Sequence, residues 1–319
     1  MLLSVADLAV VFPTRRGPLK ALDGVSYALA RGRTLGIVGE SGSGKSVMAL
    51  ALLRLVPPPG RIAAGSIRFD ERDLLALDAA SMAALRGDRI AMIFQEPMSA
   101  LNPVLTVGEQ IAEVLRLHRA MGRRAAWAGA VEALARVGIA APERRARDYP
   151  HQLSGGMRQR AMIAMALACR PALLIADEPT TALDVTIQAQ ILELMLEAQA
   201  ELGMAIQFVS HDMAVIAEVA DEVAVVYAGR IVERAPTREL IEAPLHPYSR
   251  ALIASIPLIG RAREAAGGVP GQMPSPFERP AGCRFSDRCP LADAACRAAE
   301  PALETVAPAR AVACFKAAR

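Results

Sequence analysis

The sequence GESGSGKS, residues 39–46, follows the apolar run TLGIV and leads into the apolar stretch VMALALL. It has the pattern of a phosphate-binding loop: a glycine, four variable positions, then Gly-Lys-Ser. Glycines let successive backbone N–H groups turn inward on phosphate oxygens, and the helix that follows adds the partial positive charge of its N-terminus. The pattern predicts a strand–loop–helix unit that binds a nucleoside triphosphate.

Each side chain of this loop has an expected role. We expect the loop backbone to surround the phosphates, with Lys45 reaching the β- and γ-phosphates and Ser46 ligating Mg²⁺ through its hydroxyl. A chance glycine-rich turn is the alternative, and the flanking strand and helix argue against it. The predicted phosphate-binding residues are Gly39, Ser41, Gly42, Ser43, Gly44, Lys45 and Ser46.

A second motif, LLIADEP at residues 173–179, is an apolar strand that ends in two acids. Asp177 is placed to hold Mg²⁺, through water, at the strand end. Glu178 is one residue further on, where it could orient or deprotonate the attacking water. Adjacent acids often form only a polar loop, but the upstream phosphate loop favours the catalytic interpretation.

Strands and helices alternate along most of the chain. Apolar runs predict strands at 3–12, 22–29, 34–40, 65–70, 90–97, 173–179 and 206–212, helices at 46–56, 158–169, 185–202 and 215–221, and a hairpin at 222–235 that turns at Ala228-Gly229. Residues 97–150 have a helical pattern. The alternation predicts a mainly parallel sheet with covered faces, whose functional residues gather at the carboxyl ends of the strands.

Composition excludes several other classes of protein. The net charge of +3 over 319 residues is too small and too dispersed to indicate nucleic-acid binding. No apolar run approaches the roughly 18 residues needed to span a bilayer. The N-terminal MLLSVADLAVVF carries an acid and no basic leader, so we expect no signal peptide.

Four of the five cysteines gather near the C-terminus: Cys283, Cys289, Cys296 and Cys314. Their density in an intracellular chain argues against disulfides, and the absence of CxxC pairs argues against zinc. A [4Fe–4S] cluster suits the irregular spacing best, with zinc and unligated thiols as alternatives. Cys169 is expected to be a small core residue.

Taken together, the motifs resemble the ATP-binding subunits of ABC transporters, in order and spacing. They are GESGSGKS, FQEPMSALNP (94–103), LSGGMRQR (153–160), LLIADEPTTALD (173–184) and His211. The sequence is most similar to the D-type ATPase of bacterial oligopeptide and dipeptide importers. PMSALNP, TTALDVTIQAQIL, LHPYSRALIASIP (245–257) and Met157, in place of the usual glutamine, support that branch.

The resemblance implies a fold. It predicts an α/β P-loop NTPase cassette with a RecA-like parallel-sheet core, an antiparallel β subdomain and an inserted helical subdomain at about 97–165. Residues 1–255 would form this nucleotide-binding domain. Residues 256–319 would form a C-terminal extension of the oligopeptide-transporter type that carries the four cysteines.

The resemblance also implies further site residues. Gln95 would sense Mg²⁺ or the attacking water, and His211 would hydrogen-bond the γ-phosphate. Ser154, Gly155 and Gly156 would face the γ-phosphate bound by a partner subunit, and Asp184 would cross between the subunits or simply cap a helix. Phe12 would stack on the adenine, with Tyr27 as the competing aromatic.

The implied function is ATP hydrolysis that powers peptide uptake across the bacterial inner membrane, with ATP and Mg²⁺ bound. The implied partners are a paralogous ATPase in a heterodimer, two permease subunits and an extracytoplasmic solute-binding protein, without nucleic acid. The chain would lie at the cytoplasmic face of the membrane as a peripheral subunit. A nickel or other small-solute importer is the alternative, and a soluble ABC ATPase without a transport role is a weaker one.

Overall fold

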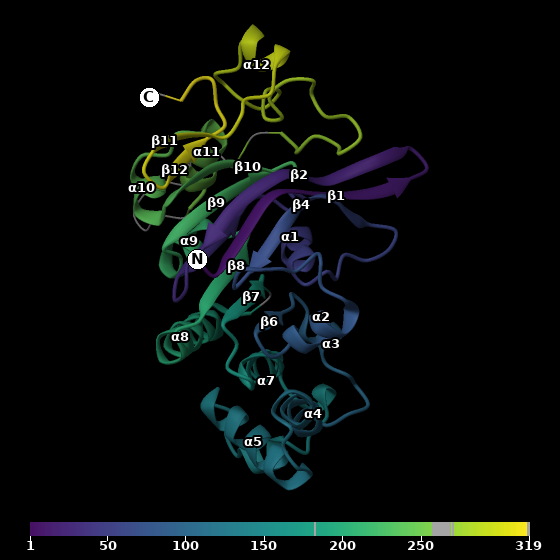
Figure 1. Cartoon of the computed structure of the whole chain (residues 1–319). Helices are drawn as coiled ribbons and strands as arrows, with labels where there is room; N and C mark the ends of the chain where they lie inside the picture. Colours follow the sequence, from purple (N-terminus) through teal and green to yellow (C-terminus); the bar gives the residue numbers. More distant parts are fainter. Residues whose placement is uncertain (182, 257–268, 270, 318–319) are drawn as a thin grey trace. The chain divides into compact units, whose positions relative to one another are not determined.

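The structure is a computed structural model that describes residues 1–181, 183–256, 269 and 271–317. The chain divides into two compact units: residues 1–76 with 208–319, and residues 77–207. Residues 257–268, which belong to the predicted extension, lie outside the described residues. Figure 1 labels the helices and strands.

The first unit contains an antiparallel sheet with the strand order β2-β1-β4-β5. Its strands are β1 (Leu3–Thr14), β2 (Gly17–Leu29), β4 (Arg61–Phe69) and β5 (Arg72–Asp73). β1 pairs with both β2 and β4, and Val5, Leu8 and Val10 of β1 are buried. The predicted strand at 65–70 thus lies within β4, which is antiparallel to β1.

The other strands of this unit run in the order β11-β12-β10-β9-β3-β8, and β8 belongs to it from residue 208 onward. They are β3 (Thr34–Val38), β8 (Ala205–Ser210), β9 (Glu222–Tyr227), β10 (Arg230–Pro236), β11 (Glu304–Ala307) and β12 (Arg310–Val312). β3 pairs with β9 in parallel, and every residue of β3 is buried. Continuous burial is typical of a parallel strand covered on both faces.

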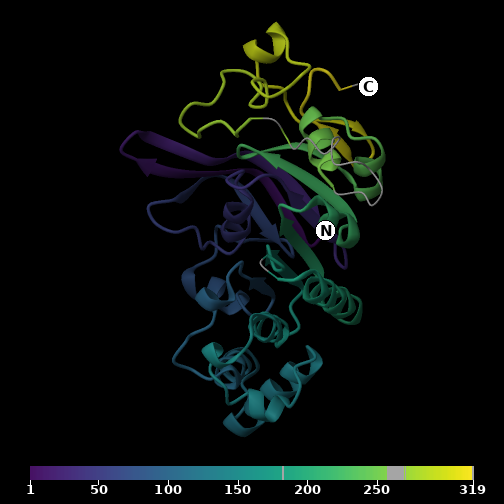
Figure 2. The same ribbon diagram turned by 180° about the vertical axis from the view of Figure 1, so that it is seen from behind.

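Helices of this unit are α1 (Lys45–Leu52), α9 (Met213–Val219), α10 (Thr237–Glu242), α11 (Pro247–Ala254) and α12 (Ala294–Ala298). α1 is shorter than the predicted 46–56 helix. Leu53 hydrogen-bonds to Leu50, and Arg54 has a left-handed φ of 52°, so the helix ends before the prolines at 57–59. β12 pairs with β10 and β11 pairs with β12; in Figure 2 these two short yellow strands lie near the C-terminus.

The second unit combines two parallel strands with helices. β6 (Ile90–Ile93) pairs in parallel with β7 (Leu173–Asp177). The helices are α2 (Ala79–Leu85), α3 (Pro97–Ala100), α4 (Val107–Arg119), α5 (Arg123–Arg136), α6 (Pro142–Arg145), the 3₁₀ turn η1 (Pro150–Gln152), α7 (Gly155–Leu167) and α8 (Val185–Leu202). Thr106 begins α4 with a reciprocal capping box to Glu109, which fixes where that helix starts.

Residues 271–317 are anchored to the rest of the unit by a buried aromatic residue and by strand pairing. Phe285 is 2 % exposed and packs against Tyr227 and Tyr248, with ring centroids 5.2 and 5.4 Å away. β12 pairs with β10, so this segment also extends the larger sheet. The segment has few large apolar side chains, so a metal site on its cysteines is one way in which it could be held in place. Aromatic packing and strand pairing supply a different anchor.

Candidate nucleotide-binding site

The phosphate loop joins β3 to α1 in the first unit, as the sequence predicts. Gly39 has no room for a side chain, because a Cβ there would lie 2.1 Å from the carbonyl oxygen of Val226. Gly44, the residue before α1, has φ +107°, which favours glycine strongly. These two positions explain why the loop needs glycine at its first and last turns.

Lys45 is buried inside the loop. Its Nζ donates to the carbonyl oxygen of Gly39 at 2.7 Å and to that of Glu40 at 3.1 Å, and the residue is 4 % exposed. The Ser43 backbone N–H donates to the same Glu40 carbonyl at 3.1 Å. The Lys45 ammonium group is thus held within the loop by the loop's own carbonyl oxygens.

Glu40 has contacts that sequence reasoning missed. Its carboxylate accepts two hydrogen bonds from Arg288, at 2.7 and 2.8 Å, and its backbone N–H donates to the Tyr248 hydroxyl at 2.9 Å. These partners are more than 200 positions away in the sequence, where no periodicity or motif connects them.

His211 and Phe12 belong to the same unit. His211 follows the last residue of β8 and is exposed. Phe12 lies on β1, half-buried, and its ring lies against the backbone of Gly60. Tyr27, the competing aromatic, is 3 % exposed and belongs to the core. Of the two aromatic residues, Tyr27 is therefore enclosed by the core, whereas Phe12 is partly accessible.

The acid pair lies at the end of β7 in the second unit. Asp177 is the last residue of the strand, and both acids are buried, at 5 % and 8 % exposed. Glu178 has a left-handed φ of 48°, which turns its side chain away from the strand direction. Gln95 Nε2 donates to Glu178 Oε2 at 3.2 Å, and the Thr181 hydroxyl donates to the same oxygen at 2.9 Å.

The structure therefore brings Gln95 and Glu178 together. Gln95 lies two residues beyond the end of β6, rather than at the strand end, and is exposed. The parallel pairing of β6 and β7 places both strand ends at one edge, which explains the contact. Thr181 was not predicted, although it lies within the quoted motif LLIADEPTTALD.

The LSGGM motif forms the start of α7 in the same unit. Ser154 is its N-cap, and its Oγ accepts from the Met157 backbone N–H at 3.3 Å. A Cβ at Gly155 would meet nothing within 4 Å, so the backbone there is open to a ligand. Gln159, which is 2 % exposed, donates to the carbonyl oxygen of Pro179, directly after the acid pair.

Asp184 caps α8, and its Oδ1 accepts from the Ile187 backbone N–H at 2.9 Å. The helix-cap interpretation from the sequence is therefore confirmed. The side chain is exposed, so the cap leaves one oxygen free to meet a second group.

Cys169 is buried at 1 % exposed, as expected of a core residue.

The other four cysteines, Cys283, Cys289, Cys296 and Cys314, line one small cavity together with His246 and Phe285. Burial raises the pKa of the Cys283 thiol to about 11 and also raises that of Cys314. Over the described residues, no group of three or more His, Cys, Asp or Glu side chains is arranged to hold a metal ion. The iron–sulfur prediction is not supported by this placement.

A glycine-rich loop that encloses a lysine between a buried parallel strand and a helix defines the class of P-loop nucleotide-binding proteins. Residues 22–181 match the ABC transporter family, and residues 232–296 match the oligopeptide/dipeptide transporter C-terminal region. The chain belongs to the ABC transporter family, in the branch that carries this C-terminal region, and the resemblance stated from the sequence is confirmed.

Relatives and solved structures agree with this family. The chain is 49 % identical to the dipeptide transport ATP-binding protein DppD of Haemophilus influenzae, over 96 % of this chain and 92 % of that protein. It is 47 % identical to the oligopeptide transport ATP-binding protein AppD of Bacillus subtilis, over 98 % and 96 %.

Among solved structures, the dimeric ATP-binding cassette MJ0796 bound to ADP and Pi is similar, with a TM-score of 0.68 and 28 % identity. The match covers 74 % of this chain and 99 % of that one. The predicted cassette fold is confirmed by this similarity, and ATP hydrolysis is the activity of the class. In the described part of the chain, no helix is both long enough and apolar enough to cross a membrane.

Proposed function

We propose that this chain is the ATP-hydrolysing subunit of an ABC importer for di- and oligopeptides. Support for the peptide substrate comes from the near full-length similarity to dipeptide and oligopeptide transport proteins. The observation that carries the ATPase assignment is the Glu178 carboxylate, which is buried and oriented by hydrogen bonds from Gln95 and Thr181. A fixed carboxylate at a strand end suits a base that orients the attacking water.

We assign the phosphate-side roles to the residues of the loop. Backbone amides of Gly39, Ser41, Gly42, Ser43 and Gly44 would bind the phosphates, and Lys45 would exchange its two carbonyl partners for phosphate oxygens. Phe12 would stack on the adenine, and His211 would hydrogen-bond the γ-phosphate. Mg²⁺, when bound, neutralises phosphate charge, and the oxygens of Ser46, Gln95 and Asp177 are the ligands its chemistry favours.

A second subunit would complete each site. Ser154, Gly155 and Gly156 offer a serine and open backbone amides at the start of a thirteen-residue helix, which is an anion-binding arrangement. We propose that they face the γ-phosphate held by a paralogous ATPase in a heterodimer, with Asp184 crossing between the subunits.

Transport also requires partners in the membrane. We propose two permease subunits and an extracytoplasmic solute-binding protein, with this chain peripheral at the cytoplasmic face of the inner membrane. Residues 1–255 would be the nucleotide-binding domain and 256–319 the extension typical of this branch. A nickel or other small-solute importer of the same branch is the alternative function.

Uptake measurements test this proposal. Deleting the coding gene should abolish uptake of a labelled dipeptide, and the wild-type gene should restore it while a Glu178→Gln version does not. Uptake of ⁶³Ni²⁺ in the same strains separates the alternative. Dipeptide uptake that persists in the deletion strain while nickel uptake is lost would contradict the peptide assignment.

An iron–sulfur cluster on the four cysteines is a separate proposal. It is supported by the one cavity that all four cysteines line, although among the described residues their side chains are not arranged to hold a metal ion. Anaerobic purification tests it, since a thiolate-ligated cluster makes the protein brown and Cys289→Ser removes the colour. Colourless protein with one zinc per chain would indicate a zinc site. Protein with neither metal would leave four free thiols.

A further inference from the structure

Residues 271–317, which are the continuous described part of the C-terminal extension, contact Glu40 of the phosphate loop through Arg288. Arg288 forms a two-pronged ion pair with Glu40, with N–O distances of 2.7 and 2.8 Å. The Arg288 side chain is 5 % exposed and that of Glu40 is 29 % exposed, so water screens the pair only in part. Paired hydrogen bonds of this geometry are among the strongest between side chains and also fix orientation.

Arg288 is itself held in place. Its guanidinium carbon lies 5.7 Å from the Tyr227 ring centroid and 5.8 Å from that of Phe285. It also donates to the Tyr227 hydroxyl at 3.3 Å and to the Val269 carbonyl at 3.1 Å. An arginine fixed by two rings and two further acceptors has one orientation, and that orientation is the one that meets Glu40.

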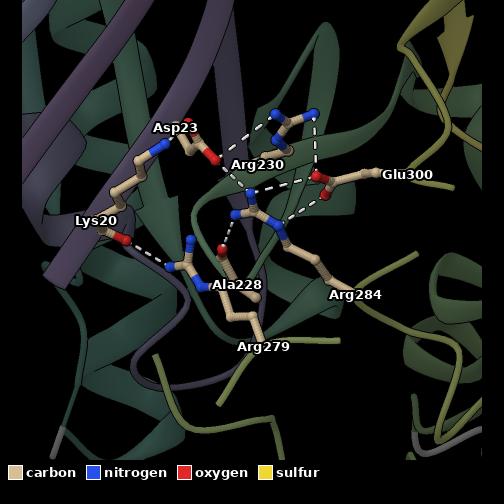
Figure 3. A network of polar contacts seen from close by, with 7 residues as sticks. All are labelled: Lys20, Asp23, Ala228, Arg230, Arg279, Arg284 and Glu300. Carbon is tan, nitrogen blue, oxygen red and sulfur yellow. Dashed lines mark hydrogen bonds and ion pairs between the residues drawn. The ribbon is translucent and has the colours of Figure 1, made fainter. Parts of the chain in front are cut away.

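A second set of contacts joins the extension to the same loop. Arg284 donates to the Ala228 carbonyl at 2.6 Å, in the turn between β9 and β10. The next residue of that turn, Gly229, donates its backbone N–H to the Ser43 carbonyl at 2.8 Å. Figure 3 shows how Arg284 reaches Ala228 while also meeting Asp23 and Glu300. The turn thus lies between the extension and the loop.

We propose that Arg288 is a positioning residue for nucleotide binding, which neutralises the Glu40 carboxylate and holds the loop ready for phosphate. This inference rests on the proposed function. Glu40 is the one acid within the loop sequence GESGSGKS, so its charge repels an incoming triphosphate unless a cation compensates it. Lys45 contacts the Glu40 carbonyl, and a loop pre-ordered around that contact pays less ordering cost when ATP binds.

Two variants of similar length separate charge from packing. Arg288→Gln removes the positive charge. Arg288→Lys keeps the positive charge but cannot form the paired hydrogen bonds of a guanidinium group. The dissociation constant of a fluorescent ATP analogue, measured with Mg²⁺ on the purified full chain, should rise about fivefold for Arg288→Gln and stay within about twofold for Arg288→Lys. Arg238→Gln is the matched control, because Arg238 is 86 % exposed and pairs with Glu242 on the surface of α10.

The double variant provides the decisive measurement. If Arg288 acts by neutralising Glu40, then Glu40→Gln combined with Arg288→Gln should bind the analogue within about twofold of wild type. A merely structural role of Arg288 would make the double variant as weak as Arg288→Gln or weaker, and that result overturns the proposal. Equal dissociation constants for Arg288→Gln and wild type would overturn it too.

Lys45→Ala keeps this test distinct from that of the proposed function. Loss of analogue binding in Lys45→Ala, with wild-type binding in Arg288→Gln, rejects only the positioning role. Full binding in Lys45→Ala would instead reject the phosphate site. Thermal unfolding of each variant checks that it is folded, and Glu40→Gln alone is expected to bind at least as tightly as wild type.

Discussion

Gln95 donates a hydrogen bond to Glu178 across 3.2 Å, from a residue just past β6 to a residue just past β7. The two strands are parallel neighbours, so their carboxyl ends deliver both side chains to one place. The Gln95 amide and the Thr181 hydroxyl both donate to Oε2 of Glu178, and together they fix the orientation of this carboxylate.

The first prediction concerns Glu178→Gln. A glutamine side chain has the shape of glutamate but cannot act as a base. We therefore expect ATP binding to persist while turnover falls by roughly 10²- to 10⁴-fold. Steady-state phosphate release and a nucleotide titration, both in the assembled transporter, measure the two effects. Glu193→Gln, the same change on the exposed side of α8, should leave both unchanged. Wild-type turnover in Glu178→Gln would remove this residue from the catalytic role.

A second prediction concerns Gln95→Glu. It replaces a donor to Glu178 with a second carboxylate at about the same 3.2 Å separation. Two carboxylates this close repel each other, and Glu178 loses the donor that orients it, so turnover should fall about 10-fold or more. Turnover as a function of pH in the assembled transporter measures this. Unchanged turnover at pH 7 would mean that the two side chains separate in the working enzyme.

The third prediction follows from His246, which is 1 % exposed and whose Nδ1 accepts from the Tyr248 backbone N–H at 3.0 Å. Burial lowers its pKa to about 3 from the ordinary value of 6.5. The unfolded chain therefore binds this proton first as the pH falls. The stability contributed by the neutral ring is complete above pH 6.5 and is lost progressively towards pH 3.

His246→Asn tests this, since asparagine can also cap α11 but does not titrate. Between pH 7 and pH 5 the free energy of unfolding should fall by about 2 kcal/mol more in the wild type than in the variant. Urea unfolding at several pH values gives the comparison. His151→Asn, a change of an exposed histidine, should follow the wild-type profile. Parallel profiles for His246→Asn and wild type would refute the assignment.

A fourth prediction concerns the ion-pair network in Figure 3. Arg284 is 8 % exposed and bonds both Asp23 of β2 and Glu300 of the extension. Burial acts to raise the pKa of Asp23, but the hydrogen bond and charge of Arg284 outweigh it and lower that pKa. Arg279 is close enough that burial, together with the charge of Arg284, lowers its pKa to about 10.

Arg284→Met keeps much of the side-chain volume but removes the cation closest to Asp23 and Glu300, which then share only the longer contacts to Arg230, at 3.6 and 3.5 Å, among the ion pairs of Figure 3. We expect a loss of about 1 to 3 kcal/mol in the free energy of unfolding and faster proteolysis within residues 271–317. Urea unfolding and timed trypsin digestion with mass spectrometry measure both. Arg238→Met on the surface of α10 should cost less than about 0.5 kcal/mol. Equal costs for the two variants would show that the network does not anchor the extension.

Local pattern predicted most of the fold. Apolar runs located β1, β3, β7 and β8, and the glycine-rich loop located the start of α1. These elements can be predicted because burial and turn formation restrict the residue types at consecutive positions. The Gln95–Glu178 pairing followed once the strands were known to be parallel. What could not be predicted depends on residues far apart in sequence.

Three features illustrate this limit. The pairing of Glu40 with Arg288 spans 248 positions, and neither residue is unusual in its own segment. β11 and β12 are four and three residues long, too short to show an alternating pattern. The four cysteines could be grouped from their density, but whether their side chains surround a metal depends on side-chain geometry that spacing does not encode.

The pairing of β12 with β10 has a consequence for the chain during its synthesis. β10 is synthesised early relative to its partner, and its outer edge stays bare until residues 310–312 leave the ribosome. A bare strand edge is a template for pairing with other chains. A chain whose translation stops between these two strands would therefore expose the edge of β10 that β12 covers, and that edge could pair with strands of other chains.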